Sequence, residues 1–183
     1  MMFPIKAKEI LPVDKIVVRS ISVRGGMGPM TVWVSNQDEI PDTNRQYNFP
    51  LNSDSWTEVY RKFHPPSYQK YVKLDLMENP ICLRPGQIRA IYVHSSLSGD
   101  EAIVYDNSNG ASRTRYQDSF IHISKGKAHL SPKPFGQSPI WGWGKSTYLQ
   151  FVLFKQTHHN LIPFSHIFLQ VMLGVTTVNL LVK

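Results

Sequence analysis

Short apolar runs, separated by Gly and Pro turns, recur along most of this chain. Residues 16–23 are rich in β-branched side chains and end at Arg24-Gly25-Gly26, and a second apolar run, residues 30–34, follows Gly28-Pro29. β-Branched residues favour strands, and Gly and Pro mark the turns between them. We therefore predict two strands here, paired as a hairpin whose loop is longer than two residues.

The middle of the chain continues this pattern. Residues 71–76 alternate between apolar and polar side chains, which predicts a strand with one buried and one solvated face. Residues 88–94 form the strongest strand pattern in the sequence. Further strands are expected at the apolar runs 56–60, 81–83, 102–105, 120–123 and 148–154, and the polar residues 35–55 are expected to form a surface loop.

These segments, without one good amphipathic helix among them, predict an all-β protein. Many short strands with turn signals between them are typical of β-sandwiches and barrels. We predict an antiparallel β-sandwich that is jelly-roll-like, with a small β-barrel as the alternative. The 183 residues suffice for one domain with its own core, and we assign residues 1–155 to it.

The composition changes abruptly after Lys155. Residues 156–182 contain no Lys, Arg, Asp or Glu, and apolar side chains dominate residues 161–182. A stretch of this length could span a bilayer, but one proline and several polar side chains within it are costly at membrane depth. We therefore expect residues 156–183 to supply the final core strands, with a tail anchor at 161–182 or an atypical terminus as alternatives.

The net charge of +7 comes from the second half of the chain. Residues 1–106 contain twelve Lys/Arg and twelve Asp/Glu, whereas residues 107–183 contain eight Lys/Arg and one acid, Asp118. Such an asymmetry predicts an anionic partner on one side of the molecule.

Most of the late cations lie between residues 113 and 145, interleaved with aromatic side chains. Aromatic rings among cations suit single-stranded nucleic acid, and flat rings also suit a sugar or a peptide. A purely structural alternative is that Trp141 and Trp143 fill the core while the lysines are solvated. The expected binding residues are Arg113, Arg115, Lys127, Lys133, Phe135, Trp141, Trp143 and Lys145.

Groups that could carry catalysis or hold a metal are few. The acidic turn at Asp100, Glu101 and Asp106 offers oxygen ligands for calcium, and with His94 it could supply the acid and base of a hydrolase. Solvated turn carboxylates are the simpler interpretation. The histidines lack the spacing of a zinc or cupin-type site, and no Gly-x-Ser-x-Gly elbow or Walker loop occurs. We predict no metal and no cofactor.

Cysteine use and the N-terminus bear on the cellular compartment. Cys82 is the only cysteine, so an internal disulfide is impossible, and its apolar neighbours predict a buried, unreactive thiol. The N-terminus lacks the apolar core of a secretory signal, and no Asn-x-Ser/Thr sequon occurs. These features favour an intracellular, cytoplasmic protein.

Together the patterns predict a non-catalytic binding module that contacts a macromolecular partner through residues 113–145. We expect a protein or peptide partner, with nucleic acid or carbohydrate as alternatives and a membrane only if residues 161–182 form an anchor. The alternative functions are a carbohydrate-binding β-sandwich and a hydrolase-like enzyme around residues 94–106.

Overall fold

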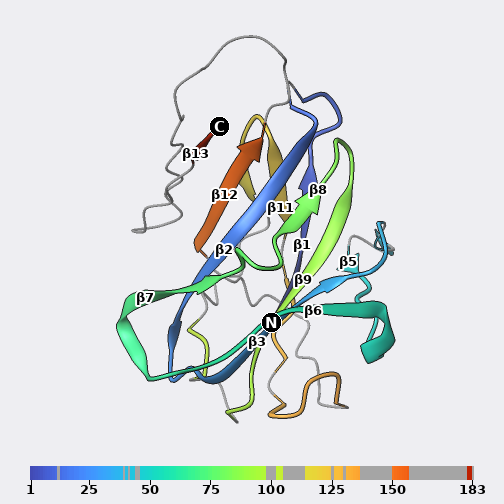
Figure 1. Ribbon diagram of the computed structural model, residues 1–183. Helices are drawn as coiled ribbons and strands as arrows, with labels where there is room; N and C mark the ends of the chain where they lie inside the picture. The colour runs from blue at the N-terminus through green and yellow to red at the C-terminus, as the bar shows by residue number, and fades with distance from the viewer. Residues whose placement is uncertain are drawn as a thin grey trace.

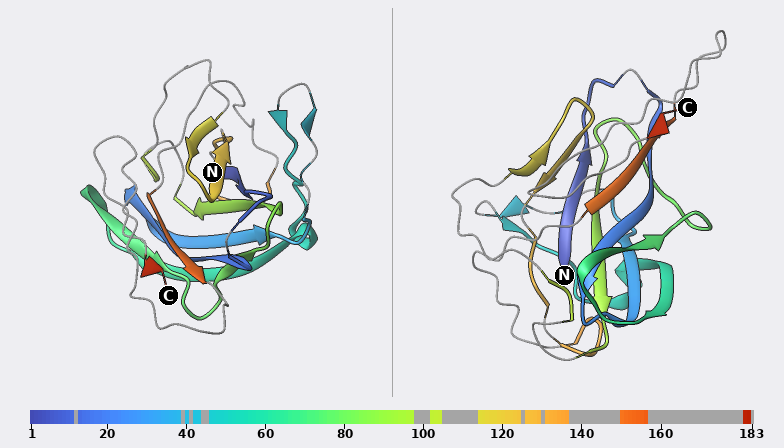
Figure 2. Two further views of the ribbon diagram at one scale, coloured as in Figure 1. Left: turned by 90° about the horizontal axis from the view of Figure 1, so that it is seen from above. Right: turned by 90° about the vertical axis from the view of Figure 1, so that its left-hand side faces the viewer.

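The computed structural model shows a two-sheet β-sandwich, which confirms the predicted all-β fold (Figures 1 and 2). It describes residues 1–11, 13–38, 40, 42–43, 46–97, 102–104, 114–124, 126–129, 131–136, 150–156 and 181–182. Within them the two main sheets remain separate layers, so the small closed barrel considered as an alternative is wrong.

The first sheet has the strand order β10-β11-β1-β9-β3-β6 and is antiparallel throughout. The second has the order β13-β12-β2-β7, with β8 also paired to β2, and is antiparallel except for the β12–β13 pair. The first sheet contains β1 (Met2–Ala7), β3 (Gly28–Ser35), β6 (Trp56–His64), β9 (Ile88–Ser95), β10 (Thr114–Gln117) and β11 (Ile121–Ser124). The second contains β2 (Lys15–Gly25), β7 (Ser67–Asp75), β8 (Ile81–Leu83), β12 (Gln150–Gln156) and β13 (Leu181–Val182). The 35–55 region adds the short pair β4 (Asp42–Thr43) and β5 (Gln46–Tyr47) and the 3-10 turn η1 (Ser53–Ser55).

The hairpin predicted between β2 and β3 is wrong, because these strands belong to different sheets. β3 pairs with β6, ending at Gly28↔His64, and β2 pairs with β7, beginning at Gly25↔Ser67. The two pairs form one antiparallel ladder that bends from one sheet into the other. Met27 and Gly28 have φ values of 53° and 68° at this bend. The positive φ values at Met27 and Gly28 therefore bend the chain from one sheet into the other and do not reverse it.

The main core lies between the two sheets and draws on both. Alternate residues of each strand point inward, as the period of a strand requires. The first sheet contributes Phe3, Ile5, Met30, Val32, Ile91 and Val93, and the second contributes Ile16, Val18, Ile21, Val23, Leu74 and Leu83.

Most of the other predicted strands are confirmed with shifted ends. Residues 88–94 lie in β9, residues 120–123 overlap β11, and residues 148–154 overlap β12. Ala102–Val104, the described part of the expected strand 102–105, forms no strand but covers the bend, where the Met27 amide donates to the Ala102 carbonyl at 2.9 Å. Cys82 is exposed, since it points outward from β8 between two buried neighbours, so the buried thiol was a wrong prediction.

Two short pieces of the C-terminal region are described, β12 and β13. They pair in parallel at Phe154↔Leu181, and residues 157–180, most of the segment expected to supply the final core strands, lie outside the described residues. In the part of the chain that the structure describes, no helix has the length and apolarity to cross a membrane.

Candidate binding surfaces

A second apolar cluster lies on the outer face of the first sheet, away from the main core. Tyr92 of β9 is at its centre, with ring centroids 5.1 Å from Trp33, 5.9 Å from Trp56 and 5.2 Å from Phe135. Residues 126–129 and 131–136 cross this face and supply Phe135, whose ring centroid also lies 5.2 Å from that of Trp33. Offset and edge-to-face aromatic contacts of this kind stabilise the packing beyond the area they bury. We call residues 126–136 the crossing loop.

Hydrogen bonds of His94, His129 and Tyr92 fasten the crossing loop to the sheet and close the loop on itself. Nε2 of His94 lies 2.8 Å from the Ser131 carbonyl, and Nε2 of His129 lies 3.2 Å from the Gly136 carbonyl. A carbonyl oxygen can only accept, so each Nε2 carries the proton. In a neutral ring Nδ1 of His129 is then the acceptor for the Tyr92 hydroxyl, 2.7 Å away. The loop is therefore tied to β9 by two imidazoles and one phenol.

Burial keeps these groups uncharged. It lowers the pKa of His94 to about 4 and also lowers the pKa of His129, against the opposing effect of their backbone hydrogen bonds. Burial likewise raises the pKa of the Tyr92 phenol. The α-amine of Met1 donates to the Val93 carbonyl at 2.6 Å, and burial lowers its pKa to about 5. Uncharged, hydrogen-bonded groups of this kind hold the loop in place.

The structure places some of the predicted binding residues. Phe135 is half-buried against the aromatic cluster, Lys127 lies with its Nζ 5.9 Å from the Phe49 ring, and Lys133 is exposed. Arg115 belongs to β10, and nothing is described of its side chain. Arg113, Trp141, Trp143 and Lys145 lie outside the described residues.

The acidic turn was the other candidate, and only its histidine is described. His94 is buried, and its ring lies 5.4 Å from the Tyr92 ring and 5.9 Å from the His129 ring. Asp100, Glu101 and Asp106 lie outside the described residues. Among the residues that the structure does describe, no group of three or more His, Cys, Asp or Glu is placed to hold a metal ion.

A basic and aromatic surface that the sequence analysis missed lies on residues 61–73. We call the strands β6 and β7 together the β6–β7 ribbon. Between Arg61 and Leu74 the sequence contains no Asp or Glu, and four of its side chains are Lys or Arg. Phe63 is 71% exposed and Tyr68 is 46% exposed. The signal was present in the sequence, but the balanced charge of residues 1–106 concealed it.

The ribbon protrudes because β7 bulges away from its partner. From Val23 to Gly25 the chain of β2 advances two residues, while the paired positions on β7 run from Val72 to Ser67, five residues apart. The extra residues are pushed out of the ladder, as expected for a bulge. The Ser67 hydroxyl donates to the Lys70 carbonyl at 2.6 Å and closes the bulge. Figure 1 shows β7 swinging out from the body of the sandwich.

Arg61, on the β6 part of the ribbon, and the crossing loop share one face of the first sheet, whereas β7 belongs to the second sheet. Thr31 of β3 pairs with Arg61 of β6 on one side and with His94 of β9 on the other. Adjacent strands lie about 4.8 Å apart, so the backbone of Arg61 is roughly 10 Å from that of His94, whose side chain binds the Ser131 carbonyl of the loop. Cations of the loop and of the ribbon can therefore contact one extended ligand.

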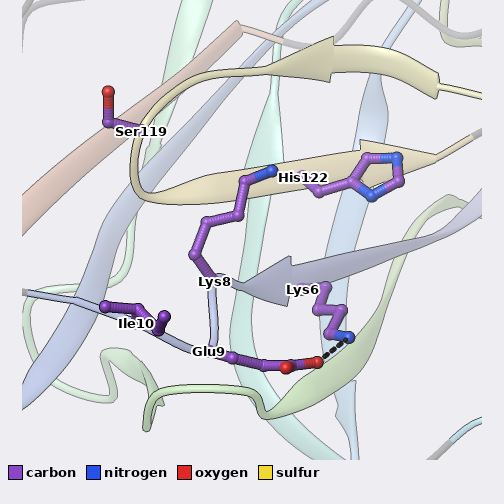
Figure 3. A pocket seen from close by; sticks show the side chains of 6 residues that line it. All are labelled: Lys6, Lys8, Glu9, Ile10, Ser119 and His122. Atoms are coloured by element: carbon purple, nitrogen blue, oxygen red, sulfur yellow. Dashed lines mark hydrogen bonds and ion pairs between the residues drawn. The ribbon is translucent and has the colours of Figure 1, made fainter.

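A separate basic cavity of about 440 Å³ lies at the other end of the first sheet. It is lined by Lys6, Lys8, Glu9, Ile10, Ser119 and His122 (Figure 3). The Lys6 ammonium is 3.0 Å from the Glu9 carboxylate, and that ion pair neutralises one of the two lysines. Lys8 points toward the side of the cavity where His122 projects from β11 (Figure 3). The pocket is open and only weakly basic.

Comparison of the chain with protein-family models, with curated proteins and with solved structures found no match. The structure itself describes the protein as a β-sandwich in which the crossing loop covers an aromatic cluster. Exposed cations lie on the crossing loop and on the β6–β7 ribbon. What it does has to be inferred from those surfaces, because a fold of this type hosts many functions.

Proposed function

We propose that this chain is a non-catalytic binding module that holds an anionic macromolecule along the crossing loop and the β6–β7 ribbon. The observation that supports the proposal is the state of three ammonium groups. Lys62, Lys70 and Lys133 are exposed, and none has a carboxylate of the described residues within ion-pair distance. Lys62 is paired with the inward-pointing Met30, so it lies on the opposite side of β6 from Arg61. Cations that are held by no close ion pair attract a polyanion and speed its encounter.

A non-catalytic role fits the groups that could otherwise react. His94, His129 and Tyr92 are buried and make the hydrogen bonds that fasten the crossing loop. A general acid or base has to reach a substrate proton, directly or through one water. These three side chains face the loop that covers them, so they act on its position.

The experiment measures binding of the full chain to heparin, a sulfated polymer without bases, across a series of salt concentrations. The variant Lys62→Gln/Lys70→Gln/Lys133→Gln removes the unpaired charges. The control Lys8→Gln/Lys15→Gln/Arg84→Gln removes the same charge at the opposite end of the sandwich, where Ile16 pairs with Leu83.

We expect salt-sensitive binding that the first variant weakens about tenfold or more and that the control leaves nearly unchanged. Equal losses in both variants would mean that net charge alone attracts the polymer, and would overturn the assignment to the crossing loop and the ribbon. Binding that ignores salt, or no binding, would overturn the proposed function.

A further inference from the structure

We infer that the β6–β7 ribbon is a docking surface for single-stranded nucleic acid, with Phe63 and Tyr68 as platforms for bases. This inference names the partner class of the proposed function and rests on it. Proteins that bind single strands combine cations that track the phosphates with aromatic rings on which successive bases stack. Both components occur on this ribbon.

The aromatic component is exposed on a stretch of restricted backbone. The Phe63 side chain is exposed to solvent on the edge strand β6, where the residue is paired with Pro29. Tyr68 lies at the start of the bulge in β7. Pro65 and Pro66 lie between them and limit the φ angles of the connection. Rings that are already exposed on a restricted backbone need little ordering when bases stack on them.

The cationic component flanks these rings in the sequence. Lys62 and Lys70 flank the two aromatic residues in sequence and have no carboxylate of the described residues within ion-pair distance. Lys62 also lines a hollow that contains Asp75 and Glu78, beyond ion-pair distance. The Arg61 guanidinium forms a two-point contact with Glu58, its Nε donating to Oε1 at 2.8 Å. Such a surface ion pair contributes little to stability, so a phosphate can compete for it. Arg61, Lys62 and Lys70 are therefore the expected phosphate contacts.

A protein partner that adds a strand to the ribbon is a poorer fit. Free sheet edges invite strand pairing, and proteins prevent it with bulges, lysines and prolines at the edge. The ribbon carries all three: the bulge closed by Ser67, the cations Lys62 and Lys70, and the Pro65-Pro66 pair. Its backbone is thus protected from pairing while its side chains remain available.

A duplex is also a poorer fit than a single strand. The bases of a duplex are stacked on one another, so exposed rings gain contact with a base only where the strand is unpaired. Phe63 and Tyr68 would gain nothing from a duplex, whereas the cations would attract either form. The ratio of the two affinities therefore reports the use of the rings.

The test uses the full chain, a labelled oligothymidylate of about 12 nucleotides, a duplex of the same length, and heparin in parallel. The variant Phe63→Leu/Tyr68→Leu keeps apolar side chains and removes the stacking faces. The control Ile10→Ala/Leu51→Ala alters two exposed apolar side chains elsewhere on the surface. A second variant, Lys62→Gln/Lys70→Gln, tests the phosphate contacts.

We expect Phe63→Leu/Tyr68→Leu to weaken oligothymidylate binding about tenfold or more and to leave heparin binding unchanged. We expect Lys62→Gln/Lys70→Gln to reduce the salt slope of oligothymidylate binding by about 1.4, at about 0.7 per phosphate contact. The duplex should bind the unaltered chain more weakly than the single strand.

Three results would overturn the inference and leave the proposed function standing, provided that heparin binds as expected. They are an oligothymidylate affinity that ignores the loss of both rings, a duplex affinity equal to that of the single strand, and self-association of the chain that disappears in Phe63→Leu/Tyr68→Leu. Failure to bind heparin and oligothymidylate alike would overturn both proposals.

Discussion

The hydroxyl of Tyr92 donates to Nδ1 of His129 at 2.7 Å, across 37 residues of sequence. This contact joins β9 to the crossing loop, because Nε2 of the same imidazole donates to the Gly136 carbonyl. One neutral ring thus bridges the sheet and the far end of the loop. The position of Lys133 on the proposed binding surface depends on this bridge.

Replacing Tyr92 with Phe should destabilise the protein by about 1–3 kcal/mol, since it leaves a buried imidazole nitrogen without its donor. Urea unfolding measures the change. The matched variant Tyr68→Phe removes a hydroxyl from an exposed side chain, and its free energy of unfolding should stay at the original value. Equal stabilities for Tyr92→Phe and the unaltered chain would show that the bridge carries no net free energy.

Stability should fall as the pH is lowered from neutral. The folded-state pKa of His94 is about 4, below its ordinary value of 6.5, so the unfolded chain binds the proton more readily. The loss therefore begins near pH 6.5 and is complete below about pH 4, and it amounts to about 3 kcal/mol at most for this residue. Unfolding by urea at a series of pH values measures it.

Neighbouring groups act in the same direction. The pKa of His129 is lowered by burial, and that of the Met1 α-amine is lowered to about 5. The variant His94→Gln keeps an amide that can donate to the Ser131 carbonyl but does not titrate. It should show a smaller loss between about pH 7 and pH 4, and an unchanged loss would assign the effect to the other groups.

The strands could be read from the sequence where the pattern is local. Ile88–His94 is rich in apolar and β-branched residues, and it forms β9 as predicted. The error at β2 and β3 arose because Gly25-Gly26 and Gly28-Pro29 are compatible with a turn and with a bend between sheets. Which one forms depends on the partners β6 and β7, far away in the sequence, and no local pattern contains that information.

The binding surface was harder to predict than the fold. Phe135 carries the residue type of a binding anchor, yet its ring packs against Trp33 and Tyr92. Phe63 looks equally apolar in sequence and is exposed. Whether a ring is buried depends on what covers the side of the strand to which it points, and the local sequence does not contain that information. A net charge counted over half the chain also hides a local run of cations such as that on residues 61–73.

Trp33 and Phe63 should therefore respond in opposite ways to truncation. Trp33→Ala removes a buried ring from between Tyr92 and Phe135 and should cost about 3–5 kcal/mol. Phe63→Ala removes an exposed ring and should change stability by no more than about 0.5 kcal/mol. Thermal unfolding of both variants measures the difference. A large loss in Phe63→Ala would reveal a structural role for that ring and weaken its assignment as a stacking platform.

Gly126 should tolerate no side chain. A Cβ built on it would overlap the Met2 carbonyl oxygen and would lie 2.9 Å from the Cβ of Phe3. The crossing loop would have to leave β1, which breaks the two backbone hydrogen bonds between Met2 and Lys127, at 2.8 and 2.7 Å. We expect Gly126→Ala to destabilise the protein by about 2 kcal/mol or more.

Amide hydrogen exchange localises this effect. The amides of Met2 and Lys127 should exchange faster in Gly126→Ala, while amides within β2 should change only through the loss of global stability. Gly136→Ala is the milder control, since its Cβ would approach no atom closer than 3.2 Å, the Ser131 hydroxyl oxygen being at 3.2 Å and the Lys133 carbonyl oxygen at 3.3 Å. Unchanged protection at Lys127 in Gly126→Ala would mean that the loop adapts without leaving the sheet, and the exposed position of Lys133 would then not depend on this close approach.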